Sequence, residues 1–404
     1  MKKSIAVLYG GRSGEHEVSL VSAASVARNL DAARYDVRLI GIAKDGGWYL
    51  QDDAELARCR EGATALSISM NGNRRVAVIP GGGVAAGLAI GNAGADAVGG
   101  RLPTGKGSDL SSLKSPDRPL LPLRTDAVFP VLHGTFGEDG TVQGLLEMAG
   151  LPYIGGGVLG SAIGMDKEIA KALWLHAGLP TVPYVALRRS DWAVRDKRTA
   201  IMEKAERDFR YPLFVKPSCA GSSVGAGIAA DREELERRTE AAFKWDDKIL
   251  IEPFVRAREV ECSVTGNDKP EAYTPGEISP THEFYDYEAK YLDPDGAALL
   301  IPAGLEETQL RTVREIAVKA YRVAELSGLA RVDFFVRKDT GEILLNEVNT
   351  MPGFTTISMF PKMCEASGLA YGPLLDRLVA LAEERHAARS ARDYSRASAP
   401  ETGA

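Results

Sequence analysis

The sequence predicts an α/β protein of several domains whose C-terminal half is of the α+β type. Three observations indicate this: an apolar strand, helix and strand at residues 4–42, a strand, glycine-rich turn and helix at residues 126–149, and a β-hairpin at residues 332–348. A chain of 404 residues is too long for one ordinary core, so two or three domains are expected.

Composition narrows the class of partner. Apolar residues make up 45% and charged residues 26%, which is typical of a globular protein. A net charge of −6 does not favour nucleic acid or an anionic membrane as a partner. The four cysteines lack metal-ligand spacing and are expected to be reduced thiols. Residues 5–8 are too short for a signal-peptide core, and residues 81–100 are too short and glycine-rich for a membrane span. We therefore expect a cytoplasmic protein without membrane insertion.

The first region opens as a βαβ unit. Strands are expected at residues 4–9 and 37–42, with a helix at residues 18–30. The intervening glycine-rich turn resembles a dinucleotide fingerprint only loosely, because its G-x-G pair is absent, so a Rossmann cofactor site is not expected. Glu15 stands at the helix start, where a carboxylate can complement the helix dipole or face a cationic ligand group.

An insertion separates this unit from the next strand. Residues 71–124 are rich in Gly, Pro and Ser; residues 76–79 form a candidate strand, and residues 81–122 are expected to be loop. A strand at residues 126–132 then leads into the turn HGTFGEDG, which begins at His133, and into a helix at residues 142–149. Ligands bind at the carboxyl ends of strands in such sheets, so His133 is a candidate site residue as well as a candidate structural one.

A second region follows the glycines at residues 155–157. A helix is expected at residues 166–177 and strands at residues 182–187 and 213–216. The last of these strands leads into KPSCAGSSVG, where small residues let backbone N–H groups approach an anion and Lys216 supplies countercharge. The loop lacks the Walker A order, so a P-loop fold is excluded, whereas a flap over phosphates and a plain solvent loop both remain open.

The next strand and a polar segment supply further candidates. At and beyond the end of the strand at residues 248–252, Glu252 and Glu259 could read an adenine edge and a ribose, or could be ordinary surface acids. A long helix is expected at residues 306–326 and a final helix at residues 371–386. Residues 279–291 are both aromatic and charged, which is typical of a lid that closes over a ligand.

The hairpin brings four polar residues to one place. If residues 339–341 form a three-residue loop, Asp333 faces Glu347 and Arg331 faces Asn349, all on one face at the open end. Two opposed carboxylates repel unless one is protonated or a cation lies between them. Oxygen ligands of this kind suit Mg²⁺ or Mn²⁺. A solvated hairpin end is the alternative.

Taken together, these segments resemble the ATP-grasp ligases and, within them, the D-alanine–D-alanine ligase family. The motifs occur in the family's order over nearly the whole chain: GGRSGEHEVS at 10–19, HGTFGEDG at 133–140, MDK at 165–167, KPSCAGSSVG at 216–225, EFYDYEAKY at 283–291, RVDF at 331–334 and NEVNTMPGFT at 346–355. The resemblance depends on all seven in sequence, because any one alone is weakly specific.

The resemblance implies a three-domain ATP-grasp architecture. Its parts would be an N-terminal α/β substrate-binding domain at residues 1–156 that carries the insertion, a central ATP-grasp subdomain at 157–256 and a C-terminal catalytic domain at 257–390, followed by a disordered tail at 391–404. It also implies ATP-dependent joining of two D-alanines through an acyl phosphate for peptidoglycan synthesis, two Mg²⁺ or Mn²⁺ ions, and a homodimer.

Site roles are carried over residue by residue. The nucleotide contacts would come from Lys167 and Lys216 at the phosphates, Lys290 at the transferred phosphate, Glu252 and the Val255 backbone at adenine, and Glu259 at the ribose. Asp333, Glu347 and Asn349 would hold the metal ions. The substrate contacts would come from Glu15, linked through Ser222 to Tyr291, from His133, and from Ser358 with the Met359 N–H at the second carboxylate. Arg331 and the Gly353 N–H would stabilise the oxyanion.

Two departures from the family pattern and two alternatives remain. The insertion is longer than in short family members, and Pro253 occupies an often polar position, which leaves its carbonyl available. One alternative is a depsipeptide ligase that makes D-alanyl-D-lactate, although Tyr291 within EAKY resembles the dipeptide-forming members. The other is a nucleotide-binding regulator without catalytic activity, whose expected mark, a replaced metal ligand or oxyanion arginine, is absent.

Overall fold

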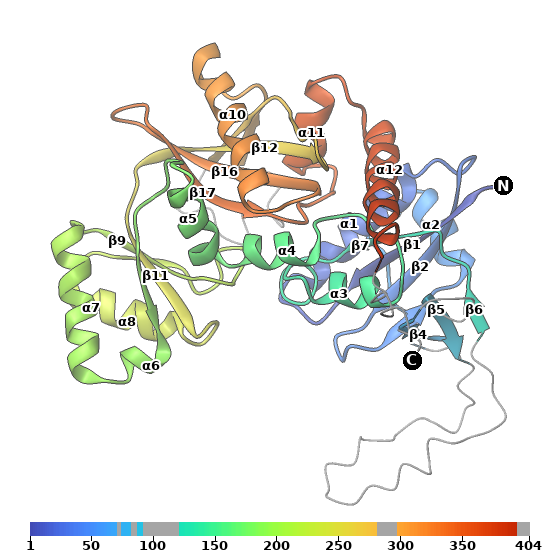
Figure 1. Ribbon diagram of the computed structural model, residues 1–404, viewed down its shortest axis with the longest axis horizontal. Coiled ribbons are helices and arrows are strands. Elements are labelled where there is room, and N and C mark those ends of the chain that lie inside the picture. Colours follow the sequence, from blue (N-terminus) through green and yellow to red (C-terminus); the bar gives the residue numbers. More distant parts are fainter. Residues whose placement is uncertain (71–73, 82–86, 92–120, 281–296, 394–404) are drawn as a thin grey trace, which may run out of the picture.

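Three β-sheets, each covered by helices, organise the residues that the computed structural model describes, namely 1–70, 74–81, 87–91, 121–280 and 297–393 (Figure 1). The predicted domain limits near residues 156 and 256 fall between the sheets, and they remain predictions. The polar segment at residues 279–291 and the tail at 391–404 lie almost entirely outside the described residues.

The first sheet has the order β6-β5-β4-β3-β2-β1-β7. Its parallel strands are β1 (Lys3–Gly10), β2 (Tyr35–Ile42) and β7 (Ala127–Val131), and α1 (His16–Asn29) connects the first two. The predicted βαβ opening is confirmed. β3 (Trp48–Leu50) continues the sheet in the antiparallel sense, and α2 (Asp53–Arg60), α3 (Thr141–Met148) and α4 (Val158–Met165) are the other helices of this region.

The insertion contributes strands to this sheet. β4 (Arg75–Ile79) matches the predicted strand, but the expected loop at residues 81–122 is wrong in part, because β5 (Gly87–Gly91) and β6 (Leu121–Leu123) lie within it. Leu88 and Ala89 are buried in the finished sheet. Such short strands between glycines depend on their neighbours for stability, so local sequence does not reveal them. Residues 92–120 lie outside the described part.

The second sheet is antiparallel and has the order β10-β9-β11-β8. Its strands are β8 (Val185–Arg188), β9 (Leu213–Pro217), β10 (Gly227–Ala229) and β11 (Lys248–Pro253), and its helices are α6 (Arg189–Trp192), α7 (Arg195–Asp208) and α8 (Arg232–Ala242). Val215 and Ile251 face the apolar core with α7 and α8. Because side chains alternate along a strand, Lys216 and Glu252 face the opposite side.

The third sheet is also antiparallel. Its strands are β12 (Ala257–Gly266), β13 (Glu271–Ala272), β14 (Gly276–Pro280), β15 (Ala297–Leu300), β16 (Gly328–Arg337) and β17 (Ile343–Asn349). Val332 and Phe334 on one face of β16 share a core with α10 (Glu307–Val323) and with Trp174 of α5 (Lys167–His176). The other face of β16 carries Arg331 and Asp333.

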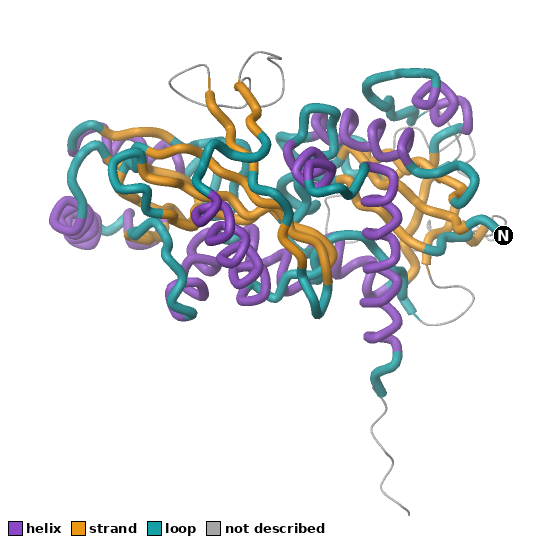
Figure 2. The backbone as a smooth tube through the Cα atoms, turned by 90° about the horizontal axis from the view of Figure 1, so that it is seen from above, coloured by secondary structure: helices purple, strands orange, loops and turns teal. Residues whose placement is uncertain are grey.

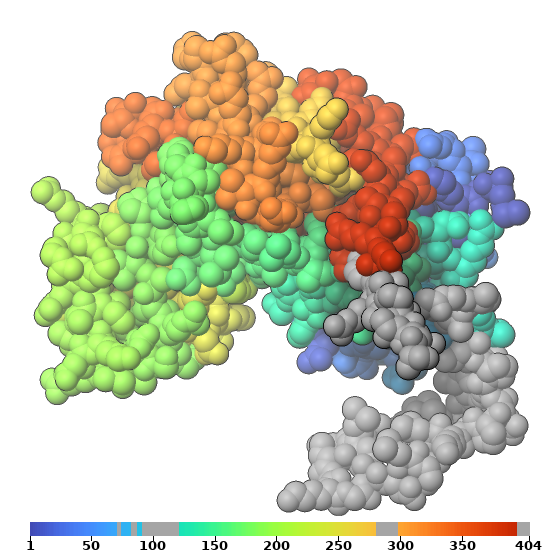
Figure 3. Space-filling view, in the orientation of Figure 1, coloured from blue at the N-terminus to red at the C-terminus, as the bar shows by residue number. Residues whose placement is uncertain are grey.

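The C-terminal helices join the first and third sheets. α11 (Met359–Ala366) follows β17, and α12 (Tyr371–Ser390) stands between two groups of strands in Figure 2. Phe354, in the loop before α11, packs edge-on against Phe129 of β7 with ring centroids 5.5 Å apart. The space-filling view shows a notch between the lime-green second-sheet region and the blue and cyan first-sheet region (Figure 3).

Candidate active site

The open end of the hairpin formed by β16 and β17 carries four polar side chains on one face. Asp333 pairs with Glu347 and Arg331 pairs with Asn349, as the sequence predicts. Val332, between them on β16, is fully buried on the α10 side. Because neighbouring side chains point to opposite faces, this burial fixes the direction of the polar group.

A β-bulge in β17 makes this register possible. Near the loop, Val336 pairs with Ile343, and the register shifts by one residue just after Asp333. The predicted three-residue loop is therefore wrong: the loop spans residues 338–341, and Asn346 is the extra residue that restores the expected pairing at the open end. Bulges re-aim side chains and are common beside functional sites.

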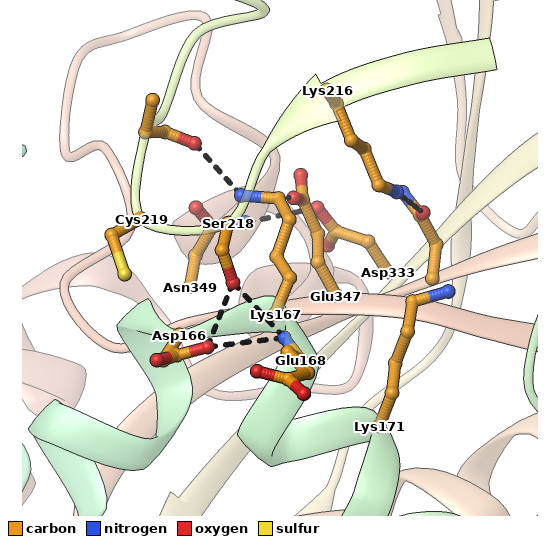
Figure 4. A network of polar contacts seen from close by, with 12 residues as sticks. Asp166, Lys167, Glu168, Lys171, Lys216, Ser218, Cys219, Asp333, Glu347 and Asn349 are labelled. Atoms are coloured by element: carbon orange, nitrogen blue, oxygen red, sulfur yellow. Dashed lines mark hydrogen bonds and ion pairs between the residues drawn. The ribbon is translucent and has the colours of Figure 1, made fainter. Parts of the chain in front are cut away.

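Each opposed carboxylate has a protein cation beside it. Arg331 donates from Nε and Nη2 to the two oxygens of Asp333, at 2.7 Å each. Lys167 Nζ lies 3.2 Å from Glu347 Oε2, and both residues are drawn in Figure 4. Burial acts to lower the pKa of Lys167, but Glu347 outweighs burial and the pKa is raised. These protein cations reduce the carboxylate repulsion, a solution that the sequence argument did not include.

The same residues form an all-oxygen donor set. The Asn349 amide donates to Asp333 Oδ2 at 2.9 Å, so the amide lies directly beside the carboxylate. In the described ranges, no group of three His, Cys, Asp or Glu side chains could hold a metal ion. A cation here would therefore need the Asn349 oxygen together with Asp333 and Glu347. Carboxylate and amide oxygens fit Mg²⁺ or Mn²⁺ chemically.

The loop at residues 216–225, here called the phosphate loop, curls beside this cluster. Ser222 and Ser223 both have left-handed backbone angles, with φ of 50° and 58°, which residues with side chains rarely adopt. Lys167 Nζ donates to the Ala220 carbonyl at 2.7 Å, which ties the loop to α5. Burial and neighbouring carboxylates raise the pKa of Cys219 to about 12, so this thiol is not an activated nucleophile at neutral pH.

Two buried lysines surround Glu252. Lys216 Nζ lies 2.9 Å from Glu252 Oε2, and Lys171 Nζ lies 2.7 Å from Oε1. Burial acts to raise the pKa of Glu252, but the two lysines outweigh burial and the pKa is lowered. The Glu252 side chain is 2% exposed, and its negative charge offsets the positive charge of the two lysines. Val255, between β11 and β12, and Glu259 on β12 are half-buried, and all three nucleotide roles remain predictions.

Glu15 reaches across to the phosphate loop. The Ser222 hydroxyl donates to its carboxylate, and this carboxylate does not cap α1. A Cβ added to Gly134 would lie 2.7 Å from Glu15 Oε2, and one added to Gly221 would lie 3.2 Å from it, so both glycines leave room for the acid. The structure thus brings Glu15 and Ser222 together. Tyr291 and Lys290 lie outside the described residues.

His133 is buried and bonded through both ring nitrogens. Its Nδ1 lies 3.0 Å from the Met351 carbonyl oxygen, and its Nε2 lies 3.1 Å from Ser22 Oγ. Burial acts to lower the pKa of His133, but the nearby Glu138 outweighs burial and the pKa is raised. His133 therefore connects the HGTFGEDG turn to the loop that follows β17, and its substrate contact remains a prediction.

The loop that follows β17 contains the residues expected to contact the oxyanion and the carboxylate of the second D-alanine. A Cβ on Gly353 would lie 2.7 Å from Ser358 Oγ, so the backbone and this hydroxyl are close. Ser358 Oγ accepts a bond from Thr355 N–H at 3.0 Å, and Met359 begins α11. The N–H groups of a helix start favour anions, which agrees with the predicted carboxylate site.

Sequence reasoning missed several residues that hold this site together. They are polar, lie between the second and third sheets, and contact partners far along the chain: Asp166, Lys171, Ser218, Lys248 and Asn346. Lys171 follows Lys167 by four residues, a spacing that places both on one side of α5. That spacing was the signal available in the sequence. No sequence signal indicated Asn346, because its role depends on the β-bulge in β17.

Family models match most of the chain. The model described as "D-ala D-ala ligase N-terminus" matches residues 4–156, and the model described as "D-ala D-ala ligase C-terminus" matches residues 173–380. The D-alanine–D-alanine ligase of Treponema denticola is 55% identical over 383 residues, which cover 95% of this chain and 96% of that protein. The enzyme of that name from Treponema pallidum strain Nichols is 46% identical over 387 residues, which cover 96% and 90%.

Solved structures of ligases are also similar to this chain over nearly its full length. The D-alanine-D-alanine ligase from Coxiella burnetii superposes with a TM-score of 0.76 at 34% identity and covers 96% of both chains. The VanG D-Ala:D-Ser ligase from Enterococcus faecalis gives a TM-score of 0.72 at 33% identity, covering 95% of this chain and 100% of that one.

Proposed function

This chain belongs to the D-alanine–D-alanine ligase family, and from that membership we propose how its own residues carry the reaction. The chain is an ATP-dependent ligase that joins two D-alanines for peptidoglycan synthesis, and the expected α/β ATP-grasp fold is confirmed. The observation that carries the mechanism is the row of Asp333, Glu347 and Asn349, with Lys167 between this row and the phosphate loop.

The first step activates a carboxylate. An oxygen of the first D-alanine carboxylate attacks the γ-phosphorus of ATP, an O–P bond forms, and the bond to the β-bridging oxygen breaks to release ADP. Lys167 and Lys216 place positive charge beside the phosphates. Asp333, Glu347 and Asn349 would hold the Mg²⁺ or Mn²⁺ ions, which when bound neutralise charge on the transferring phosphoryl group.

The second step forms the peptide bond. The amine of the second D-alanine, after loss of a proton, attacks the acyl carbon and builds a tetrahedral oxyanion, which collapses with release of inorganic phosphate. Arg331 and the Gly353 N–H face this charge in the proposal, and one such donor is typically worth about 3 kcal/mol. Glu15 would hold the first ammonium, while Ser358 and the Met359 N–H would hold the second carboxylate. Lys290 and Tyr291 keep their predicted roles.

The setting of the enzyme follows from its substrates. Among the described residues, no helix is long and apolar enough to cross a membrane. We propose that the enzyme works in the cytoplasm, where ATP is available, and that it is a homodimer.

Product analysis tests the proposal. The enzyme is incubated at neutral pH with ATP, magnesium and D-alanine, with and without competing D-lactate or D-serine, and the products are identified by mass spectrometry. We expect D-alanyl-D-alanine as the main product together with ADP and phosphate. A predominant ester with D-lactate would support the depsipeptide alternative, and absence of phosphate release with D-alanine would support a regulator without catalytic activity.

A further inference from the structure

Lys216 lies within a closed ring of contacts between the second and third sheets. Its Nζ donates to Asn346 Oδ1 at 3.1 Å and lies 2.9 Å from Glu252 Oε2. The other Glu252 oxygen lies 2.7 Å from Lys171 Nζ, which also donates to the Val182 carbonyl at 3.1 Å.

Backbone bonds close the ring beside the bulge. The Val182 N–H donates to the Leu345 carbonyl at 3.3 Å, and the Leu345 N–H donates to the Pro180 carbonyl at 2.8 Å. Leu345 directly precedes Asn346, so residues 180–182 brace β17 where the extra residue is inserted. Lys171 therefore contacts Glu252, which holds Lys216 from one side. It also contacts residues 180–182, which support the part of β17 that carries Asn346, the residue that holds Lys216 from the other side.

The charges around the ring explain why two lysines are present. Glu252 is almost fully buried, and an isolated carboxylate there would be strongly unfavourable. Lys171 is fully buried and pairs with one Glu252 oxygen. The Glu252 carboxylate therefore keeps a positive partner when Lys216 turns toward an anion. Asn346 is a neutral acceptor, so its bond with Lys216 is weaker than a second ion pair would be. Lys216 is thus oriented but can be released.

We propose that Asn346 and Lys171 are positioning residues that hold the Lys216 ammonium ready for the phosphates of ATP. The inference depends on the proposed contact between Lys216 and those phosphates. A free lysine side chain loses up to about 2 kcal/mol of conformational entropy when it is ordered. In this enzyme protein groups hold Lys216 in place, so in the proposal ATP binding does not bear that loss.

The test is a double-mutant cycle read by nucleotide affinity. Titration calorimetry on the full chain with magnesium measures the Kd of ATP and of adenosine for Lys216→Met, Asn346→Leu and the double variant. We expect Asn346→Leu to weaken ATP binding about 5- to 10-fold, which corresponds to about 1–1.4 kcal/mol. Adenosine affinity should stay unchanged. In the Lys216→Met background, Asn346→Leu should add nothing, because it acts through Lys216.

Lys171 is tested with a conservative rescue. Lys171→Met should weaken ATP binding, Lys171→Arg should restore most of the affinity, and Lys319→Met, an exposed lysine on α10, is the control that should change nothing. The melting temperature of each variant establishes that it is folded. If Lys171→Met does not fold, the Asn346 cycle still decides.

The outcomes separate the inference from the mechanism on which it depends. If Lys216→Met binds ATP normally, the proposed role of Lys216 fails. If Lys216→Met weakens ATP binding but Asn346→Leu does not, the positioning role is overturned and the mechanism stands. A full additive loss in the double variant, or an equal loss for adenosine, would also overturn the positioning role.

Discussion

Glu347 is the residue on which the metal proposal depends most directly. It lies opposite Asp333 and 3.2 Å from Lys167 Nζ. Its charge therefore contributes to the proposed metal ligands and also pairs with Lys167. Glu347→Gln keeps the side-chain shape and removes the charge. We expect turnover to fall by roughly 10³-fold or more, because a metal held by one carboxylate is bound weakly.

Steady-state kinetics over a range of magnesium concentrations measures this effect. The matched control is Glu342→Gln, an exposed acid just before β17 that pairs loosely with Arg337, and it should retain activity. Activity near the wild-type level in Glu347→Gln would remove this residue from the proposed metal site.

Arg331 provides a second prediction at this scale. Its guanidinium holds both Asp333 oxygens and lies 3.1 Å from Glu261 Oε2, so its direction is fixed from two strands. Arg331→Lys keeps the charge and loses the fork. We expect kcat to fall about 10²- to 10³-fold, with a smaller change in the KM for ATP. Arg337→Lys, at the far end of β16, is the control, and equal losses in both variants would count against an oxyanion role.

Sequence reasoning located the polar cluster at the hairpin end because period-two alternation determines which side chains share a face. It reached Asp333, Glu347, Arg331 and Asn349 from two β-prone runs and an assumed three-residue loop; that loop is wrong, and the pairing holds because the bulge in β17 compensates for it. It missed Asn346, because an extra residue in one strand is visible only when both strands are paired. Contacts between residues far apart in the chain, such as the one between Lys171 and Glu252, leave no local pattern.

At the scale of elements, α5 is held by its first turn. Asp166 caps the helix by accepting bonds from the Glu168 and Ile169 N–H groups, and the same carboxylate accepts from Ser218 and Lys248. Burial acts to raise the pKa of Asp166, but Lys248 and Ser218 outweigh burial and the pKa is lowered. This cap orients the helix that delivers Lys167 to the site.

Asp166→Asn tests the charge of this cap while keeping a good capping side chain. Because the folded-state pKa is lowered, the charge contributes fully to stability above the unfolded-state value of 3.8, and this contribution is lost as the pH falls below 3.8 and through the lowered folded-state pKa. We expect a loss of about 2 kcal/mol in the free energy of unfolding at pH 7, shrinking toward pH 3, by urea denaturation. Asp191→Asn, in an exposed pair with Lys197, should cost less than about 0.5 kcal/mol. A pH-independent difference for Asp166→Asn would contradict this account.

Elements with strong periodicity were predictable, and short ones were not. α10 follows an apolar pattern with a period of 3.6 residues, whereas β1 and the second half of β2 are continuous buried runs, as expected for parallel strands that are covered on both faces. β5 and β6 are short and lie among glycines and prolines, and their stability comes from neighbouring strands, since β5 pairs with β4 and β6 pairs with β5 only in the finished sheet.

At the scale of the molecule, α12 connects the first sheet to the third. The Arg385 guanidinium lies 4.3 Å from the Tyr153 ring centroid, donates to the Tyr153 carbonyl at 2.7 Å and donates to Ser327 Oγ at 2.8 Å. These contacts join α12 to the segment that follows α3 and to the start of β16. No local sequence pattern indicates this contact, since its partners are more than 50 residues away.

Arg385→Lys should lower the free energy of unfolding by about 2 kcal/mol, because lysine cannot make the stacked, forked set of contacts. Arg389→Lys, one turn later on α12, is exposed and pairs with Glu147, so it should cost less than about 0.5 kcal/mol. Chemical denaturation of both variants makes the comparison. Equal costs would show that Arg385 does not join the two sheets energetically.

The central claim is that ATP activates a D-alanine carboxylate before the amine attacks. Isotope transfer tests it most directly: D-alanine labelled with ¹⁸O in its carboxylate is incubated with ATP and magnesium, and the released phosphate is analysed by ³¹P NMR. Activation through an acyl phosphate predicts one ¹⁸O atom in the phosphate for each dipeptide formed, because the bridging oxygen of the acyl phosphate comes from the carboxylate. Dipeptide formed with unlabelled phosphate would contradict it.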